Sequence, residues 1–325
     1  MFRRLLPSAF LLVAFSALAG AAAAQTPYPD HAVTMLVPFP PGGVADTVAR
    51  PVAEALAREL GQPVIVENRA GAGGALGIGV AARAPADGYT VLLSLSSISI
   101  LPEADAILNR KPAFHLSDFK PIARFTADPT VLVVRADSPW RTLGEFIADA
   151  KRKPGAYNYG SSGNYGTMHV PMEMLKSAAG FRMTHIPYTG AGPAITALLA
   201  GQIDALASGP STVVQQIQAG RLRPLAHWGD APLAALPGVP SLTQAGYPVR
   251  FAQWSGLFVA AKTPEPIVQR LRVAAAKAAA DPVVRQVVAK AGSPIEYLDA
   301  PAFQTYWDAD AKTMTQAVRK IGRLE

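Results

Sequence analysis

The segment from Val33 to Asp46 constrains the fold of this 325-residue chain more than any other. It reads Val-Thr-Met-Leu-Val-Pro-Phe-Pro-Pro-Gly-Gly-Val-Ala-Asp, which predicts a buried strand over residues 33–37 followed by a tight Pro/Gly loop. Apolar residues then recur every four positions from Val48 to Leu60, as on the buried face of a helix. A strand, a glycine turn and a helix form the opening unit of an α/β domain, and backbone N–H groups at the helix start can bind an anion.

Two further units of the same kind follow. A strand over residues 64–68 leads into a glycine loop and a helix at Ala75–Ala84, and a strand over 89–95 leads into a polar loop at 94–97. Residues 98–120 show no regular pattern. Because ligands bind beyond the carboxyl ends of parallel strands, the three loops are expected to share one site.

The rest of the chain repeats this architecture without a linker-like spacer. We predict an α/β fold with two lobes, each a parallel-core sheet with flanking helices, in which a central lobe is inserted into an outer one. The first lobe would comprise residues 25–126 and 252–325, and residues 127–251 would form the inserted second lobe. Further strands are predicted at 131–135, 183–186, 203–206 and 251–260, and another begins at 157. Further helices are predicted at 142–151, 193–200, 264–280, 282–291 and 301–321. Two more helices are predicted to begin at Thr167, as N-cap, and at Ser208.

The first 24 residues are predicted to be a signal peptide. Arg3 and Arg4 precede the apolar run Leu5–Leu18, and small residues lead to a cleavage site after Ala24. An uncleaved membrane anchor is the alternative, but the run is short for a span of roughly 20 residues. The chain has no cysteine, which excludes disulfides and a thiol nucleophile and, with export, favours the bacterial periplasm.

The charge balance points to small anions. Without the first 24 residues, 28 basic residues face 23 acidic ones, a net charge of +5. The excess is spread out, and no motif or basic run with interleaved aromatic residues indicates nucleic-acid binding. The histidines show no metal-binding spacing and no cofactor motif is complete, so neither a metal nor a cofactor is expected.

Two glycine-containing loops invite an enzymatic interpretation. Residues 71–77 are similar to a dinucleotide loop, but the third glycine comes one residue late for Gly-x-Gly-x-x-Gly, which leaves a structural turn or a small-anion loop. Gly160-Ser161-Ser162-Gly163 departs from the Gly-x-Ser-x-Gly nucleophile motif. A secreted hydrolase would use Ser161 or Ser162 with a base such as His185, but no third group is fixed to hold that base. We interpret both serines as hydroxyl donors to a carboxylate.

The acidic residues near the loops have structural explanations. Asp46 and Glu173 fall in early helical turns, where an acid favours the helix dipole, and Asp204 is expected to cap or turn. His169 is equally compatible with packing and with ligand contact. Since no acid/base pair or nucleophile system emerges, the residues favour a receptor over an enzyme.

A set of motifs carries a resemblance to a known family. They are Val37–Asp46, Gly61–Gly74, Ala86–Leu92, Tyr159–Asn164 with Thr167 and His169, Ile186–Ala194, Leu198–Asp204 and Ala219–Ala226. Together they resemble the Bug-type extracytoplasmic solute receptors of tripartite tricarboxylate transporters, in order over nearly the whole chain after residue 24.

The resemblance implies the periplasmic-binding-protein (Venus flytrap, type II) fold. It implies a monomer whose two lobes close on a small mono- or dicarboxylate for uptake by membrane permease subunits. It implies that loop backbone, hydroxyls and bridging waters hold the ligand. The ligand-binding residues that it implies are Phe39, Pro40, Gly42, Gly43, Asp46, Asn68, Gly71, Ala72, Gly73, Ser96, Ser97, Ser161, Ser162, Asn164, Thr167, His169, Tyr188 and, less directly, Ser208. A protein that presents the carboxylate to a two-component sensor is the alternative, and a secreted serine hydrolase is a further one.

The chain departs from the family pattern in two respects. Where relatives often carry Asp or Asn after the Gln-Ile/Val-Asp motif, residues 205–210 offer Ser208, which favours a plain mono- or dicarboxylate over an amino acid. Pro51 and Pro171 also fall inside predicted helices, so these helices are expected to start late or bend.

Overall fold

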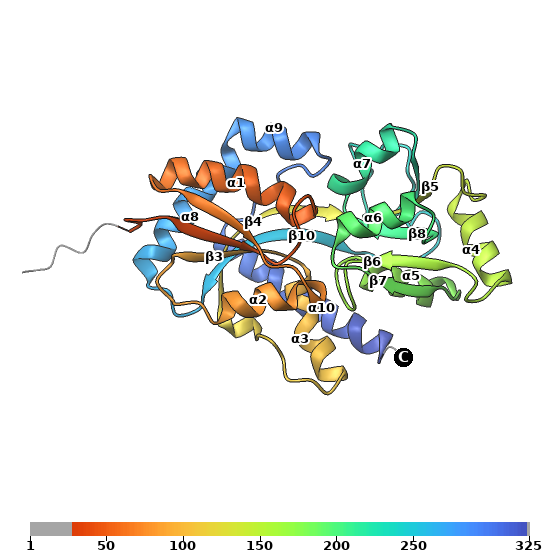
Figure 1. Ribbon diagram of the computed structural model, residues 1–325, viewed down its shortest axis with the longest axis horizontal. Coiled ribbons are helices and arrows are strands. Elements are labelled where there is room, and N and C mark those ends of the chain that lie inside the picture. Colours follow the sequence, from red (N-terminus) through yellow and green to blue (C-terminus); the bar gives the residue numbers. More distant parts are fainter. Residues whose placement is uncertain (1–27, 324–325) are drawn as a thin grey trace, which may run out of the picture.

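The computed structural model describes residues 28–323, which form two lobes, each built on a five-stranded sheet with helices on both faces (Figure 1). The predicted signal peptide lies outside the described residues. None of the helices in residues 28–323 combines the length and hydrophobicity that a membrane span requires. The predicted α/β two-lobed fold is confirmed, although each sheet is mixed because antiparallel strands join its parallel core.

The first sheet has the strand order β2-β1-β3-β10-β4. The strands β1, β2 and β3 are parallel, whereas β10 runs antiparallel between β3 and β4. Its strands are β1 (Val33–Val37), β2 (Val64–Asn68), β3 (Thr90–Leu95), β4 (Phe119–Pro129) and β10 (Ala252–Ala260). One face packs against α1 (Val44–Leu60), α8 (Glu265–Ala280) and α9 (Pro282–Lys290), and the other against α2 (Ala75–Ala82), α3 (Ser97–Ile107) and α10 (Ala300–Ile321).

The second sheet has the order β7-β6-β8-β5-β9. Its strands are β5 (Val131–Arg135), β6 (Asn158–Ser161), β7 (Thr184–Pro187), β8 (Ala205–Ser208) and β9 (Leu222–His227). Alternate residues of β5 face opposite cores, as the period of a strand requires. Leu132 and Val134 pack with α4 (Leu143–Arg152) and α5 (Val170–Ala179), and Val131 and Val133 with α6 (Ala191–Leu199) and α7 (Pro210–Gln218).

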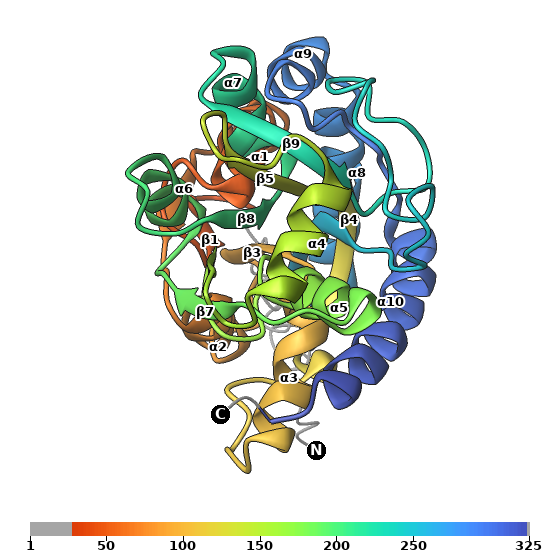
Figure 2. The ribbon, with the colours of Figure 1, turned by 90° about the vertical axis from the view of Figure 1, so that its right-hand side faces the viewer.

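Three segments connect the lobes. Strand β4 passes into β5 through Thr130, and the chain returns at the start of β10. Helix α10 runs along both lobes beside α3 and α5 (Figure 2): Phe303 and Trp307 belong to the core of the first, while Met314 and Val318 belong to a core built around the second sheet. The predicted lobe boundaries stay a prediction.

The structure corrects several predicted elements. Residues 97–107 form helix α3 and residues 119–129 form strand β4, where no regular structure was expected, and β9 was also missed. The polar loop at 94–97 is instead the end of β3 and the start of α3. Thr167 is not an N-cap, because α5 begins only at Val170, with His169 in the N-cap position. Pro171 therefore lies in the first turn, which confirms the late start, whereas α1 continues through Pro51.

Candidate functional site

The loops at the carboxyl ends of β1, β2 and β3 meet the loop after β6 and the starts of α6 and α7. The approach is closest at glycines. A methyl group on Gly163 would lie 2.8 Å from the backbone nitrogen of Gly73, and one on Gly190 would overlap the ring of Pro40. The two halves of the molecule are therefore closed on each other, and the absence of side chains at these positions permits that closure.

A small buried cavity lies between the closed halves. Its volume is about 10 Å³, which is room for about one water molecule. Its lining carries no charged side chain and comprises Phe39, Gly43, Val44, Leu95, Ser162, Thr167, Met168, Ala191 and Gln253. A ligand of several carbon atoms requires the halves to separate, as in hinge-type closure around a ligand.

Several polar atoms around this cavity have no hydrogen-bond partner. Ser162 Oγ and Gln253 Oε1 belong to residues that line it, and both atoms are buried. The hydroxyls of Ser96 and Ser97 are also buried and unpaired, and a methyl group on Gly74 would lie 3.3 Å from Ser97 Oγ and 3.1 Å from the Phe39 ring. Buried polar groups are nearly always paired in native proteins, so these atoms indicate a polar ligand or water.

The main chain adds donors from both sides. Val44 and Ala191 are the first residues of α1 and α6, and both line the cavity. The N–H groups of a first helical turn have no partner within the helix, and they carry the positive end of the helix dipole. Two helix N-termini from opposite halves therefore converge on one uncharged cavity, an arrangement that suits an anion.

Asp46 shapes the first loop rather than lining the cavity. Its carboxylate accepts hydrogen bonds from Gly42 N at 2.9 Å, from Arg50 at 2.9 and 3.0 Å and from Asn68 Nδ2 at 3.0 Å. Asn68 also donates to the carbonyl of Phe39 at 2.9 Å. Burial opposes the charge of Asp46, but these donors outweigh it and hold the pKa of Asp46 below its ordinary value. The carboxylate thus fixes the loop that carries Phe39.

The hydroxyl of Ser161 forms hydrogen bonds with neighbouring residues of its own lobe. Its Oγ lies 2.6 Å from His185 Nε2 and accepts a bond from Gly163 N at 3.0 Å, and the residue is completely buried. The structure therefore places His185, the base that a hydrolase would need, beside Ser161. Burial, and next the neighbouring His169, lower the pKa of His185 to about 3. Within residues 28–323 no carboxylate hydrogen-bonds His185, so no third group holds that ring as a catalytic base.

His169 likewise holds its own loop. Its Nδ1 accepts a hydrogen bond from Tyr165 N at 3.0 Å, so the ring proton of the neutral form sits on Nε2, which lies 3.8 Å from Glu173 Oε1. Burial, and then Lys176, lower the pKa of His169 to about 3. The ring does not line the cavity, but it fixes the turn that brings Thr167 there.

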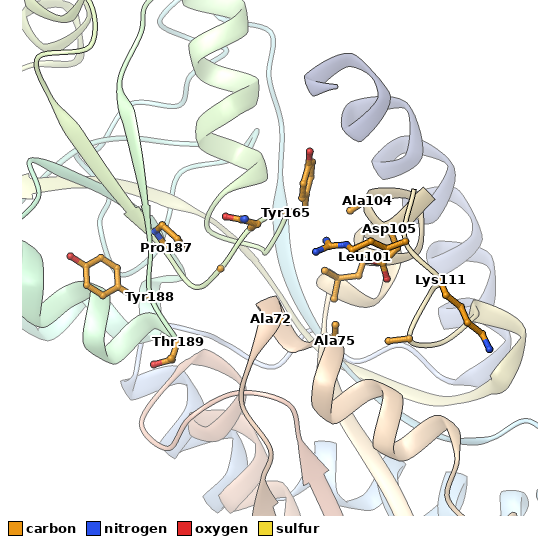
Figure 3. Close-up of a pocket in the computed structure, with 14 residues that line it drawn as sticks. Ala72, Ala75, Leu101, Ala104, Asp105, Lys111, Tyr165, Pro187, Tyr188 and Thr189 are labelled. Carbon is orange, nitrogen blue, oxygen red and sulfur yellow. Dashed lines mark ion pairs between the residues drawn. The ribbon is translucent and has the colours of Figure 1, made fainter. Parts of the chain in front are cut away.

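A larger outer chamber opens between the halves, and Gly163, Asn164 and Tyr165 of the loop after β6 line it (Figure 3). Its volume is about 710 Å³, and its lining includes three of the predicted residues, Ala72, Asn164 and Tyr188. Arg110 and Lys111 line it as well, and Arg110 is paired with Asp105 at 3.3 Å.

The structure thus separates the predicted residues into groups. Phe39, Gly43, Ser162 and Thr167 line the inner cavity, and Ala72, Asn164 and Tyr188 line the outer chamber. Pro40, Gly71 and Gly73 lie in the closing loops, and Ser208 is turned to Thr212, with 2.8 Å between the hydroxyls. Sequence reasoning missed Val44, Leu95, Met168, Ala191 and Gln253. Only Gln253 gave a signal, as a polar residue in an apolar strand at the expected crossing.

Comparison with known proteins places the chain among solute receptors. Residues 48–323 match the model of the tripartite tricarboxylate transporter family receptor. The chain is 36% identical to protein BugT of Bordetella pertussis over 245 residues, which is 75% of this chain and 74% of BugT. It is similar to the structure of the periplasmic binding protein BugD, with a TM-score of 0.85, 29% identity and coverage of 90% and 98% of the two chains. It is also similar to MatC from Rhodopseudomonas palustris with bound malate, with a TM-score of 0.82, 28% identity and coverage of 89% and 99%.

Proposed function

Since the chain belongs to the receptor family of tripartite tricarboxylate transporters, we propose that it captures a small mono- or dicarboxylate between its two lobes. The observation that carries this proposal is the convergence of two helix N-termini on the inner cavity. Val44 and Ala191 begin these helices, and the unpaired hydroxyl of Ser162 lies between the halves with them. Backbone N–H groups and a hydroxyl are donors, as a carboxylate requires.

The similarity to MatC supports the chemical class of the ligand. That protein has malate bound, and the carboxylates of such a ligand accept hydrogen bonds, which neutral donors supply. Each hydrogen bond to a charged group contributes about 1.5–3 kcal/mol. Several such bonds support micromolar binding, which corresponds to about −8 kcal/mol.

The mechanism follows from the closed arrangement. The lobes separate about the crossings at Thr130 and before Ala252, the ligand enters, and the halves then close on it. The closed receptor then docks on permease subunits in the membrane. This account places the chain in the periplasm and gives it no catalytic step.

A thermal-unfolding screen of small mono- and dicarboxylates tests the proposal. A ligand at one hundred times its Kd adds about 2.7 kcal/mol to the free energy of unfolding. We expect at least one carboxylate to raise the unfolding temperature. No response to any of them, or turnover of an ester that Ser161→Ala abolishes, would contradict it.

Two further measurements sharpen the assignment. Because the cavity lining is uncharged, ligand affinity should change little between about 50 and 200 mM salt, unlike that of a site built on exposed ion pairs. Loss of carboxylate uptake on deletion of the gene supports transport, whereas normal uptake with loss of a transcriptional response supports the sensory alternative.

A further inference from the structure

One buried group in the inner cavity is not explained by carboxylate binding. Gln253 lies on β10, at the crossing between the lobes, and is 2% exposed. Its Nε2 donates to Thr167 Oγ1 at 2.5 Å, across the two halves. Its Oε1 has no partner, although the residue lines the cavity. An amide oxygen only accepts hydrogen bonds, so it cannot pair with a carboxylate.

We propose that Gln253 Oε1 accepts a hydrogen bond from a hydroxyl group of the ligand, and that the receptor therefore selects hydroxycarboxylates over acids that lack the hydroxyl. This inference rests on the proposed function, because it refines the ligand of the same cavity. It also revises the sequence-based expectation of a plain mono- or dicarboxylate.

A hydroxyl fits this position better than an ammonium group. The nine lining residues include no carboxylate. Asp46, in the first turn of α1, is bonded to Gly42, Arg50 and Asn68. A buried ammonium without a counter-charge is costly, whereas a neutral hydroxyl needs only an acceptor. Gln253 Oε1 is that acceptor. The hydrogen bond to Thr167 holds the amide through its nitrogen and leaves its oxygen without a partner.

The geometry links this selection to closure. A methyl group on Gly209, at the start of α7, would lie 2.5 Å from Gln253 Oε1. Thr167 and Gly209 belong to the half that carries the second sheet, whereas Gln253 belongs to the strand returning to the first. The amide therefore occupies its final environment only when the halves are together. An acid without the hydroxyl leaves a buried acceptor unpaired in that state.

Matched acids test the proposal by titration calorimetry. The probes are malate against succinate and lactate against propionate, pairs that differ by one hydroxyl. We expect the hydroxy acid of at least one pair to bind about tenfold more tightly or better. In Gln253→Met, which keeps the length of the side chain, the ratio of the two affinities should fall to about one, because the hydroxy acid then binds more weakly. Gln269→Met, at an exposed helix position, is the control and should keep the wild-type ratio.

The outcomes separate this inference from the proposed function. Binding of plain acids with no preference for the hydroxyl would overturn the inference and leave the receptor assignment standing. A ratio unchanged in Gln253→Met would also overturn it, as would an equal loss of both acids, which would mean that the amide donates to the carboxylate. Absence of binding to every carboxylate would overturn both. Thermal unfolding without ligand checks that Gln253→Met is folded.

Discussion

Gly163 and Gly73 face each other across the two halves so closely that a single added carbon has no room. A methyl group on Gly163 would lie 2.8 Å from Gly73 N and 3.2 Å from its Cα. Both are backbone atoms that cannot rotate away. The two loops can meet this closely because residue 163 is a glycine, which links a local sequence feature directly to closure.

Gly163→Ala should therefore hold the lobes apart. We expect ligand affinity to fall about tenfold or more, because closure loses contacts worth at least about 1.4 kcal/mol, and small-angle scattering should show a larger radius of gyration in the presence of ligand. Gly155→Ala is the control. Gly155 has a positive φ of +75°, as Gly163 has one of +121°, but a methyl group on Gly155 would have no atom within 4 Å. Gly155→Ala should lower stability by about 1 kcal/mol and leave affinity unchanged. Wild-type affinity in Gly163→Ala would mean that this contact does not control closure.

The adjacent serines should behave differently. Ser162 Oγ is unpaired in the cavity, so Ser162→Ala should weaken carboxylate binding about tenfold with no loss of stability. Ser161 Oγ bonds His185 and Gly163 N, so Ser161→Ala should lower the free energy of unfolding by about 1 kcal/mol or more. Calorimetry and urea unfolding of both variants measure the two effects. The reverse pattern would show that the roles are exchanged.

The sequence predicts the loops but not the space between them. The family motifs identify Phe39, Gly43 and Ser162, because each motif is a continuous stretch of the sequence. Gln253 was not predicted, because its role depends on the contact between Thr167 and a strand from a distant part of the chain. Strand β4 contains Pro121, Lys120 and Arg124, which local propensity counts against a strand. Its pairing with β10 and its burial outweigh that propensity, and only the tertiary fold supplies them.

Asp46→Asn should destabilise the first loop. The carboxylate accepts hydrogen bonds from Gly42 N, Arg50 and Asn68 together. We expect the substitution to lower the free energy of unfolding by about 2 kcal/mol at pH 7. Because the pKa of Asp46 is lowered in the folded state, its stabilisation is present above the unfolded pKa and is lost as the pH falls through the folded one. The deficit of the variant should therefore shrink in acid. Asp308→Asn, at an exposed position that bonds only Gln304, should change stability by less than about 0.5 kcal/mol. An equal effect of both substitutions would contradict the role of Asp46.

Asp128 provides the opposite pH dependence at the crossing between the lobes. It pairs with Gln253 in the register of β4 and β10 and is 4% exposed. Burial, with a further contribution from Glu296, raises the pKa of Asp128 to about 7, against the lowering influence of the nearby Ser293 hydroxyl and of the charge of Arg124. The folded state therefore favours the protonated acid. Its contribution to stability is complete below the unfolded pKa of about 4 and is lost as the pH rises through about 7.

The difference between wild type and Asp128→Asn isolates this effect from other titrating groups. Asparagine keeps the shape and cannot ionise, so the variant should gain stability relative to wild type as the pH rises from about 4 to about 7, by about 1.4 kcal/mol for each pH unit. Urea unfolding at half-unit steps from pH 4 to 8 gives the two curves. The difference should level off above pH 7, because Asp128 is then ionised in both states. A difference that is flat across this range, or that grows in the other direction, would mean that Asp128 is ionised in the folded protein well below neutrality and that the crossing tolerates its charge.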